Sequence, residues 1–116
     1  MKTTCKAAGL FPHPPVMIPE IGGRELSRMA LTIKTEEEAM HKMVSSGIET
    51  VIIISPHNLC FHDGPALFLA DSISGNLSDF GYPQLSMTLS IDRMLAEAVL
   101  QEAAPLIPLH RVDEEE

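Results

Sequence analysis

Aromatic side chains, cysteines and positive charge are all scarce in this sequence. Of its 116 residues, 4% are aromatic, and Lys and Arg number 8 against 16 Asp and Glu. The formal net charge of −8, with no basic patch, argues against nucleic acid as a partner. Two cysteines without a CxxC spacing argue against a disulfide framework and favour a cytoplasmic chain with free thiols.

Long hydrophobic runs are also missing. The longest apolar runs, such as residues 66–70, fall far short of the ~20 residues that a membrane-spanning helix needs. No apolar stretch typical of a secretory signal follows the first lysines. We therefore expect no membrane partner. With 45% hydrophobic residues, the chain can form one modest core, so residues 1–116 are expected to be a single domain.

The densest hydrophobic run predicts a central strand. Val51–Ile54 consists of four β-branched residues, a run too short for a buried helix and typical of a strand covered on both faces. The run ends at Ser55 and Pro56, because proline has no backbone N–H and disfavours the helical conformation of its predecessor. His57 is therefore expected just beyond the carboxyl end of that strand, at the edge where open α/β sheets bind ligands.

A second segment has the same form. Cys5–Phe11 is a predicted strand, and it is followed by His13 between prolines. From about residue 24 to residue 46, apolar side chains recur at helical spacing, and Gly47 suits the position just after a helix. Strand, helix and strand predict an α/β fold with a central, mostly parallel sheet flanked by helices. In that fold, His13 and His57 share one rim of the sheet.

The rest of the chain predicts further elements of the same sheet. We expect a loop over 58–65, a strand over 66–70, a long surface loop over 71–82 and an edge or antiparallel strand over 84–89. A helix capped by Ser90 should end before Pro105, and residues 106–109 could start another strand. This sheet is incomplete, which predicts that the chain is the amino-terminal part of a larger α/β domain.

Two imidazoles at one rim suggest a metal site. Neutral imidazole is the commonest metal ligand, and two histidines with one carboxylate form the facial triad of non-haem Fe(II) oxygenases. The alternative is that His13 and His57 only cap strand ends through hydrogen bonds to the backbone.

Other polar residues are weaker candidates for this site. His62 and Asp63 lie in a predicted loop, and Glu20 follows the first histidine closely enough to reach a metal. His41, on the polar face of the first helix, and His110, near the acidic carboxyl end, are expected to be solvated.

The residues around the two histidines resemble the start of a known family. Gly9–Gly22 with its PHPP element, a helix, and Glu49–His57 with its SPH element are similar to the catalytic subunit of class III extradiol ring-cleavage dioxygenases. The likeness is strongest to the branch linked to the AmmeMemoRadiSam system and the Memo proteins. Asp79–Pro83 continues the resemblance.

The resemblance implies Fe(II) held by His13, His57 and a glutamate, with O2 and a small aromatic diol as reactants. An incomplete sheet exposes an edge that invites association, so a homo-oligomer or a partner subunit is a further expectation. The family's glutamate ligand and its acid/base histidine lie in a later half, so no catalytic residue is assigned here and the chain alone is expected to be inactive. Two alternatives are a non-catalytic, Memo-like binding module and zinc-dependent hydrolysis at the same rim.

Overall fold

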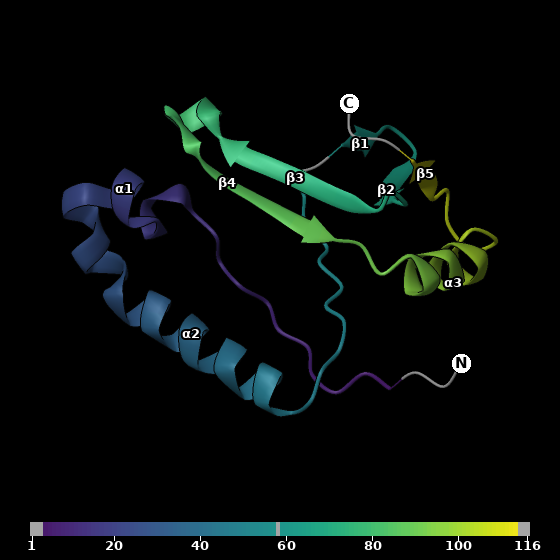
Figure 1. The fold of residues 1–116 in the computed structure, drawn as a ribbon, viewed down its shortest axis with the longest axis horizontal. Coiled ribbons are helices and arrows are strands. Elements are labelled where there is room, and N and C mark those ends of the chain that lie inside the picture. The colour runs from purple at the N-terminus through teal and green to yellow at the C-terminus, as the bar shows by residue number, and fades with distance from the viewer. Residues whose placement is uncertain (1–3, 58, 114–116) are drawn as a thin grey trace. The chain divides into compact units, whose positions relative to one another are not determined.

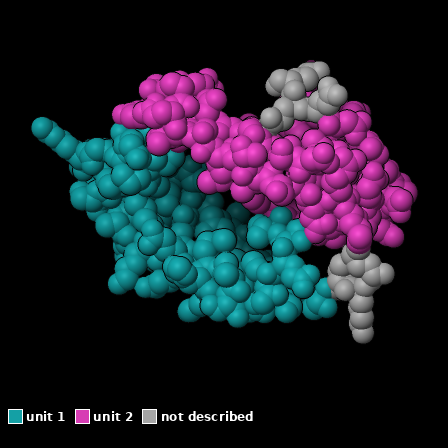
Figure 2. All heavy atoms as spheres, in the orientation of Figure 1, with its two compact units in different colours: residues 1–51 teal, residues 52–116 magenta. Residues whose placement is uncertain are grey.

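The computed structural model describes residues 4–57 and 59–113. Asn58, which follows the second histidine of the sequence motif, and the last three acidic residues lie outside the described residues. The chain divides into two compact units, Met1–Val51 and Ile52–Glu116, which are coloured separately in Figure 2.

The first unit is built around one long helix, α2 (Ala30–Ser45). Three short elements precede it and pack on one another in succession (Figure 1): η1 (Pro15–Met17), α1 (Pro19–Gly22) and η2 (Gly23–Met29). The predicted helix over residues 24–46 is therefore confirmed, with a 3-10 first part. Gly47 follows it with φ +80°, the left-handed conformation that the sequence predicts just after the helix.

Residues 4–14 run as an irregular segment along α2. The Lys6 ammonium donates to the Ser46 carbonyl at 3.3 Å, and a Cβ at Gly9 would stand 2.9 Å from Cε of Met43. The strand predicted for Cys5–Phe11 is wrong. In the described part of the chain no strand lies beside this segment to form a ladder, and a helix lies beside it instead.

The strand predicted for Val51–Ile54 is wrong as well. These four residues form no strand, and their exposed fractions are 56, 65, 70 and 94%. β-branched residues favour strands because they fit a pleated, half-buried surface, and none of the described strands pairs with this run to create that surface.

The second unit contains the strands. Its elements follow in this order: β1 (Cys60–Phe61), β2 (Gly64–Phe68), β3 (Ser72–Leu77), η3 (Ser78–Phe80), β4 (Tyr82–Ser90), α3 (Arg93–Ala103) and β5 (His110–Val112). One sheet has the order β1-β2-β5, with β1 antiparallel and β5 parallel to β2, and β3 pairs with β4 as a separate antiparallel ribbon. The mixed α/β class predicted from the sequence is confirmed. Parallel pairing within residues 59–113 joins β2 and β5, whose connection includes α3.

Local predictions for this unit have mixed outcomes. The strands expected over 66–70 and 84–89 are confirmed as β2 and β4. The prediction of a long loop over 71–82 is wrong, because Ser72–Leu77 forms β3 and pairs with β4. The hydroxyls of Ser74 and Thr88 form a hydrogen bond across this ribbon at 2.8 Å. The strand suggested for 106–109 is wrong, since β5 begins only at His110.

The cap of the last helix also differs from the prediction. Asp92, not Ser90, is the N-cap of α3, and its carboxylate accepts a hydrogen bond from the Leu95 amide at 3.0 Å. Ser90 instead ends β4, paired with Ser72. Both residues suit a helix N-cap, so the sequence alone does not separate them. None of the helices in residues 4–57 and 59–113 has the length and apolar character to cross a bilayer.

The core of the second unit centres on Leu69. Its side chain is 1% exposed, and its amide donates to the Val112 carbonyl at 2.8 Å, which continues the pairing of β2 with β5. Ala96 of α3 is the other buried apolar residue among those described.

We predict that Leu69→Ala destabilises the chain by about 2–5 kcal/mol, because it removes buried methyl groups and leaves a cavity. Leu106→Ala is the matched control: Leu106 is 82% exposed, and its loss should change the free energy of unfolding by less than about 0.5 kcal/mol. Urea unfolding followed by far-ultraviolet circular dichroism measures both. Equal effects of the two substitutions would contradict the assignment of Leu69 to the core.

Candidate metal-binding residues

His13 lies in the extended segment that leads into η1, between Pro12 and Pro14. Proline fixes φ, and Pro14 has φ −68° and ψ 142°, so the backbone next to the histidine is stiff and extended. Nδ1 of His13 lies 3.4 Å from the carbonyl oxygen of Phe11. A carbonyl oxygen only accepts, so in this contact Nδ1 carries the proton and the ring is oriented by the Phe11 carbonyl.

His57 follows Ser55 and Pro56 in a turn of the second unit. Its backbone amide donates to the Ser55 hydroxyl oxygen at 3.2 Å, so the Ser-Pro pair ends the apolar run and fixes the backbone of the histidine. The two strands that should bring His13 and His57 to one rim are not formed. The shared metal site of the two histidines therefore stays a prediction.

The weaker candidates come from both units. Glu20 is exposed in the first turn of α1, and His62 is exposed at the turn between β1 and β2. His41 is exposed on α2, as predicted. Among the residues that the structure describes, no three His, Cys, Asp or Glu side chains gather into a metal site.

The partial burial of Glu36 was not predicted from the sequence. The sequence places Glu36–Glu38 on the polar side of the helix, and Glu37 and Glu38 are indeed exposed. Glu36 is only partly exposed, and its Oε1 is buried with no hydrogen-bond partner in the described structure. The helical spacing does indicate this burial. Glu36 precedes the apolar Met43 by seven residues, or two helical turns, so both side chains lie on one face of α2.

The donors of the first unit fit a divalent metal in their chemistry. Imidazole is one of the ligand types of non-haem iron sites, and His13 is the candidate ligand that this unit contributes. A carboxylate oxygen that is withdrawn from water without a hydrogen bond is costly unless a proton or a cation compensates it.

A different polar cluster forms in the second unit, around His110. Nε2 of His110 lies 2.6 Å from Oδ1 of Asp63, and the imidazole stacks on Phe61 with ring centroids 4.1 Å apart. The expectation that His110 is solvated is wrong, since its side chain is 34% exposed and partnered. Parallel pairing of β5 with β2 sets His110 opposite Ala66, which brings it to the β1–β2 hairpin and could not be read from the sequence.

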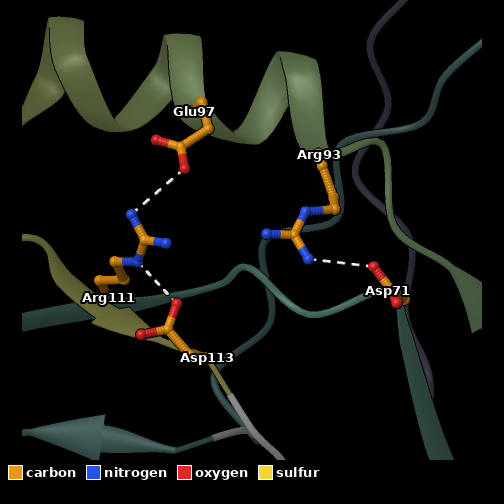
Figure 3. Close-up of polar contacts among 5 residues, drawn as sticks. All are labelled: Asp71, Arg93, Glu97, Arg111 and Asp113. Atoms are coloured by element: carbon orange, nitrogen blue, oxygen red, sulfur yellow. Dashed lines mark hydrogen bonds and ion pairs between the residues drawn. The ribbon is translucent and has the colours of Figure 1, made fainter.

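Charged pairs connect α3 to its surroundings (Figure 3). Arg111 of β5 binds Glu97 of α3 at 3.2 Å and Asp113 at 2.6 Å, and Asp113 raises the pKa of the Arg111 guanidinium. Arg93 binds Asp71, just before β3, at 3.0 Å. The Arg111–Glu97 pair joins α3 to β5 and the Arg93–Asp71 pair joins α3 to the residue before β3, so we assign these side chains a structural role.

The contact with His110 lowers the pKa of the Asp63 carboxyl, mainly through the hydrogen bond between the two side chains. A carboxyl whose pKa is lower in the folded state stabilises the fold above its unfolded pKa, and that stabilisation is lost as the pH falls through the folded pKa.

We predict that an NMR titration of the Asp63 carboxyl carbon gives a pKa below the ordinary aspartate range. His110→Ala should return this pKa towards that range, because the hydrogen bond that favours the ionised form is gone. His62→Ala, in the neighbouring loop position, should leave it unchanged. A titration that is the same in all three proteins would contradict the pairing of Asp63 with His110.

Comparison with known proteins identifies a family that matches residues 7–107 of this chain. A family model described as the catalytic LigB subunit of aromatic ring-opening dioxygenase matches residues 7–107. The Clostridium acetobutylicum protein CA_C1420 is 36% identical over 94 residues, which are 81% of this chain but only 20% of that protein. No solved structure matches. Since the family model covers most of the sequence, including both PHPP and SPH elements, the chain belongs to the family of the catalytic LigB subunit of aromatic ring-opening dioxygenases.

Proposed function

We propose that this chain supplies two histidine ligands, His13 and His57, to a ferrous iron site that opens catecholic rings with O2. The observation that carries this proposal is the family match, which spans residues 7–107 and so contains both histidines. Further support comes from the local structure, because a proline stands next to each histidine and limits the freedom of its backbone.

Ferrous iron held by these histidines and a carboxylate would supply the binding of the diol and of O2. The role of this chain is to supply the neutral imidazole groups of its two histidines as ligands. For His13, the contact of Nδ1 with the Phe11 carbonyl selects the tautomer whose Nε2 donates to a metal. For His57, the hydrogen bond from its amide to the Ser55 hydroxyl holds the turn. Ligands that are ordered before binding lose less entropy on binding, which favours metal affinity.

The matched region is 20% of the length of the Clostridium relative, so the activity of the whole protein is itself part of the proposal. We propose that a glutamate ligand and an acid/base histidine come from a part of the family's catalytic domain that this chain does not contain. A second copy or a partner subunit is proposed to complete the enzyme. The substrate proposed is a small aromatic diol, and the location proposed is the cytoplasm.

We predict that the chain binds Fe(II) with one-to-one stoichiometry in an anaerobic calorimetric titration. His13→Ala and His57→Ala should each weaken binding at least about tenfold, because each removes a ligand. His41→Ala is the control, since His41 is an exposed histidine of α2 with no proposed role. If His13→Ala and His57→Ala both bind as the unchanged chain does, the two histidines are structural caps and not ligands.

Oxygen consumption separates the enzyme from the non-catalytic alternative. In a protein as long as the Clostridium relative, iron loading and a catechol should produce O2 uptake that His13→Ala abolishes. Iron binding without O2 uptake from any catechol would favour a regulatory binding module. Tight zinc binding with esterase activity would favour hydrolysis.

A further inference from the structure

We infer that the chain associates with a second copy of itself along the free edge of strand β4, the edge that faces away from β3. The two β4 strands pair antiparallel about a two-fold axis. In the described structure β3 and β4 pair only with each other, so the outer edge of β4 has no neighbouring strand. This inference goes beyond the proposed function, because it names the surface through which a second copy binds, and it does not depend on iron.

The backbone groups at this edge follow from the register of the ribbon. Ser72 lies opposite Ser90, so Asp71 and Ile91 continue the same register by one pair. The Ile91 amide donates to the Asp71 carbonyl at 3.0 Å, which marks this pair as a hydrogen-bonded one. In an antiparallel ladder, hydrogen-bonded pairs alternate with pairs whose N–H and C=O groups point away from each other.

The alternation assigns every second residue of β4 to the free edge. Met87 and Leu89 point their backbone groups towards β3, and Ser86, Thr88 and Ser90 point theirs outwards. Each outward residue has both an N–H and a C=O, since none of the three is a proline. These groups can therefore form a complete ladder with another strand.

This edge lacks the features with which proteins block strand pairing, namely charged side chains, prolines and bulges. No residue of β4 (Tyr82–Ser90) is charged, and its one proline, Pro83, is at the second position. The register shift of the ribbon lies between Asn76 and Leu77, so residues 86–90 are regularly paired. A regular, uncharged edge strand is a template for another chain.

Charge favours a second copy as the occupant of this edge. The chain has a formal net charge of −8, and 21% of its residues are charged. Ser72–Ser90, by contrast, contains one charged residue, Asp79, which lies in η3 and not in a strand. Two copies can therefore meet along β4 away from most of their like charge, whereas a strongly charged partner would find no charge to attract it.

Antiparallel pairing of two β4 strands also matches the faces of the ribbon. Successive side chains of a strand point to opposite faces, so Ser86, Thr88 and Ser90 lie on one face and Met87 and Leu89 on the other. Directly opposite residues share a face, so every second register aligns hydroxyl with hydroxyl and apolar with apolar side chains. Met87 and Leu89 are 65 and 46% exposed and can make these contacts. The product is a four-stranded sheet, which is more stable than a two-stranded ribbon.

Hydrogen exchange of the metal-free chain, resolved by residue with NMR, tests the edge directly. Sedimentation velocity over a range of concentrations should show a monomer in equilibrium with a dimer. In the dimer, the amides of Ser86 and Thr88 should exchange at least about tenfold more slowly than in dilute protein, because pairing gives them acceptors. The amides of Met87 and Leu89, which bond to β3 in both states, should change less.

Ser86→Pro tests the same edge by substitution. It removes an outward N–H without removing a hydrogen bond to β3, and it should raise the dissociation constant of the dimer at least about tenfold. Ser72→Pro is the matched control, because Ser72 is an exposed serine whose amide points to the outer edge of β3. It should leave the dissociation constant unchanged. Far-ultraviolet circular dichroism checks that both variants keep their strands, and if Ser86→Pro loses them, the exchange of the unchanged chain decides.

Four outcomes would overturn the inference. The first is a monomer at every concentration, and the second is a dimer in which the exchange of Ser86 and Thr88 does not slow. The third is a dimer that Ser72→Pro dissociates and Ser86→Pro does not, which would place the contact at β3. The fourth is protection of these amides at every dilution in a protein as long as the Clostridium relative, because the rest of that protein would then cover the edge. Since all four are measured without metal, none of them bears on His13 and His57 as iron ligands.

Discussion

The packing of the amino-terminal segment on α2 is the constraint on which the first unit depends. Lys6 contacts the end of the helix and Gly9 lies against Met43, one turn earlier, so the segment runs antiparallel to α2. Glycine at position 9 allows this close approach, because a side chain there would force the ends of the Met43 and Phe11 side chains to move.

The second unit depends on a different contact, the parallel pairing of β2 with β5. Leu69 extends that pairing by one hydrogen bond and is the most deeply buried large side chain of the described chain. The return through α3 brings Arg111 under Glu97 and His110 beside Asp63. These polar contacts follow from the topology, since residues 47 positions apart in the sequence meet only because β5 lies next to β2.

The sequence predicted the elements that depend on neighbouring residues. It failed for the segments whose structure depends on pairing with a distant strand. Helical spacing and Gly47 predicted α2, and the alternation of 84–89 predicted β4. The run Val51–Ile54 has the composition of a buried strand. A strand also needs a second strand to pair with, and among the described residues none pairs with this run. The opposite error occurred at Ser72–Leu77, whose serines, glycine and asparagine are typical of loops. It became a strand because the alternating residues of β4 offered it a partner.

The same reasoning explains which site residues could be found from the sequence. His13 and His57 stand in short motifs that a resemblance can recognise, and the family match over 7–107 includes both. Glu36 stands in no motif, and it lies in a run of three glutamates that looks like a solvated helix face. Only the packing of α2 distinguishes it from its two neighbours. Burial of its Oε1 without a hydrogen-bond partner costs stability, because a carboxylate oxygen withdrawn from water has lost its solvation, and the run of three glutamates gives no sign of this difference.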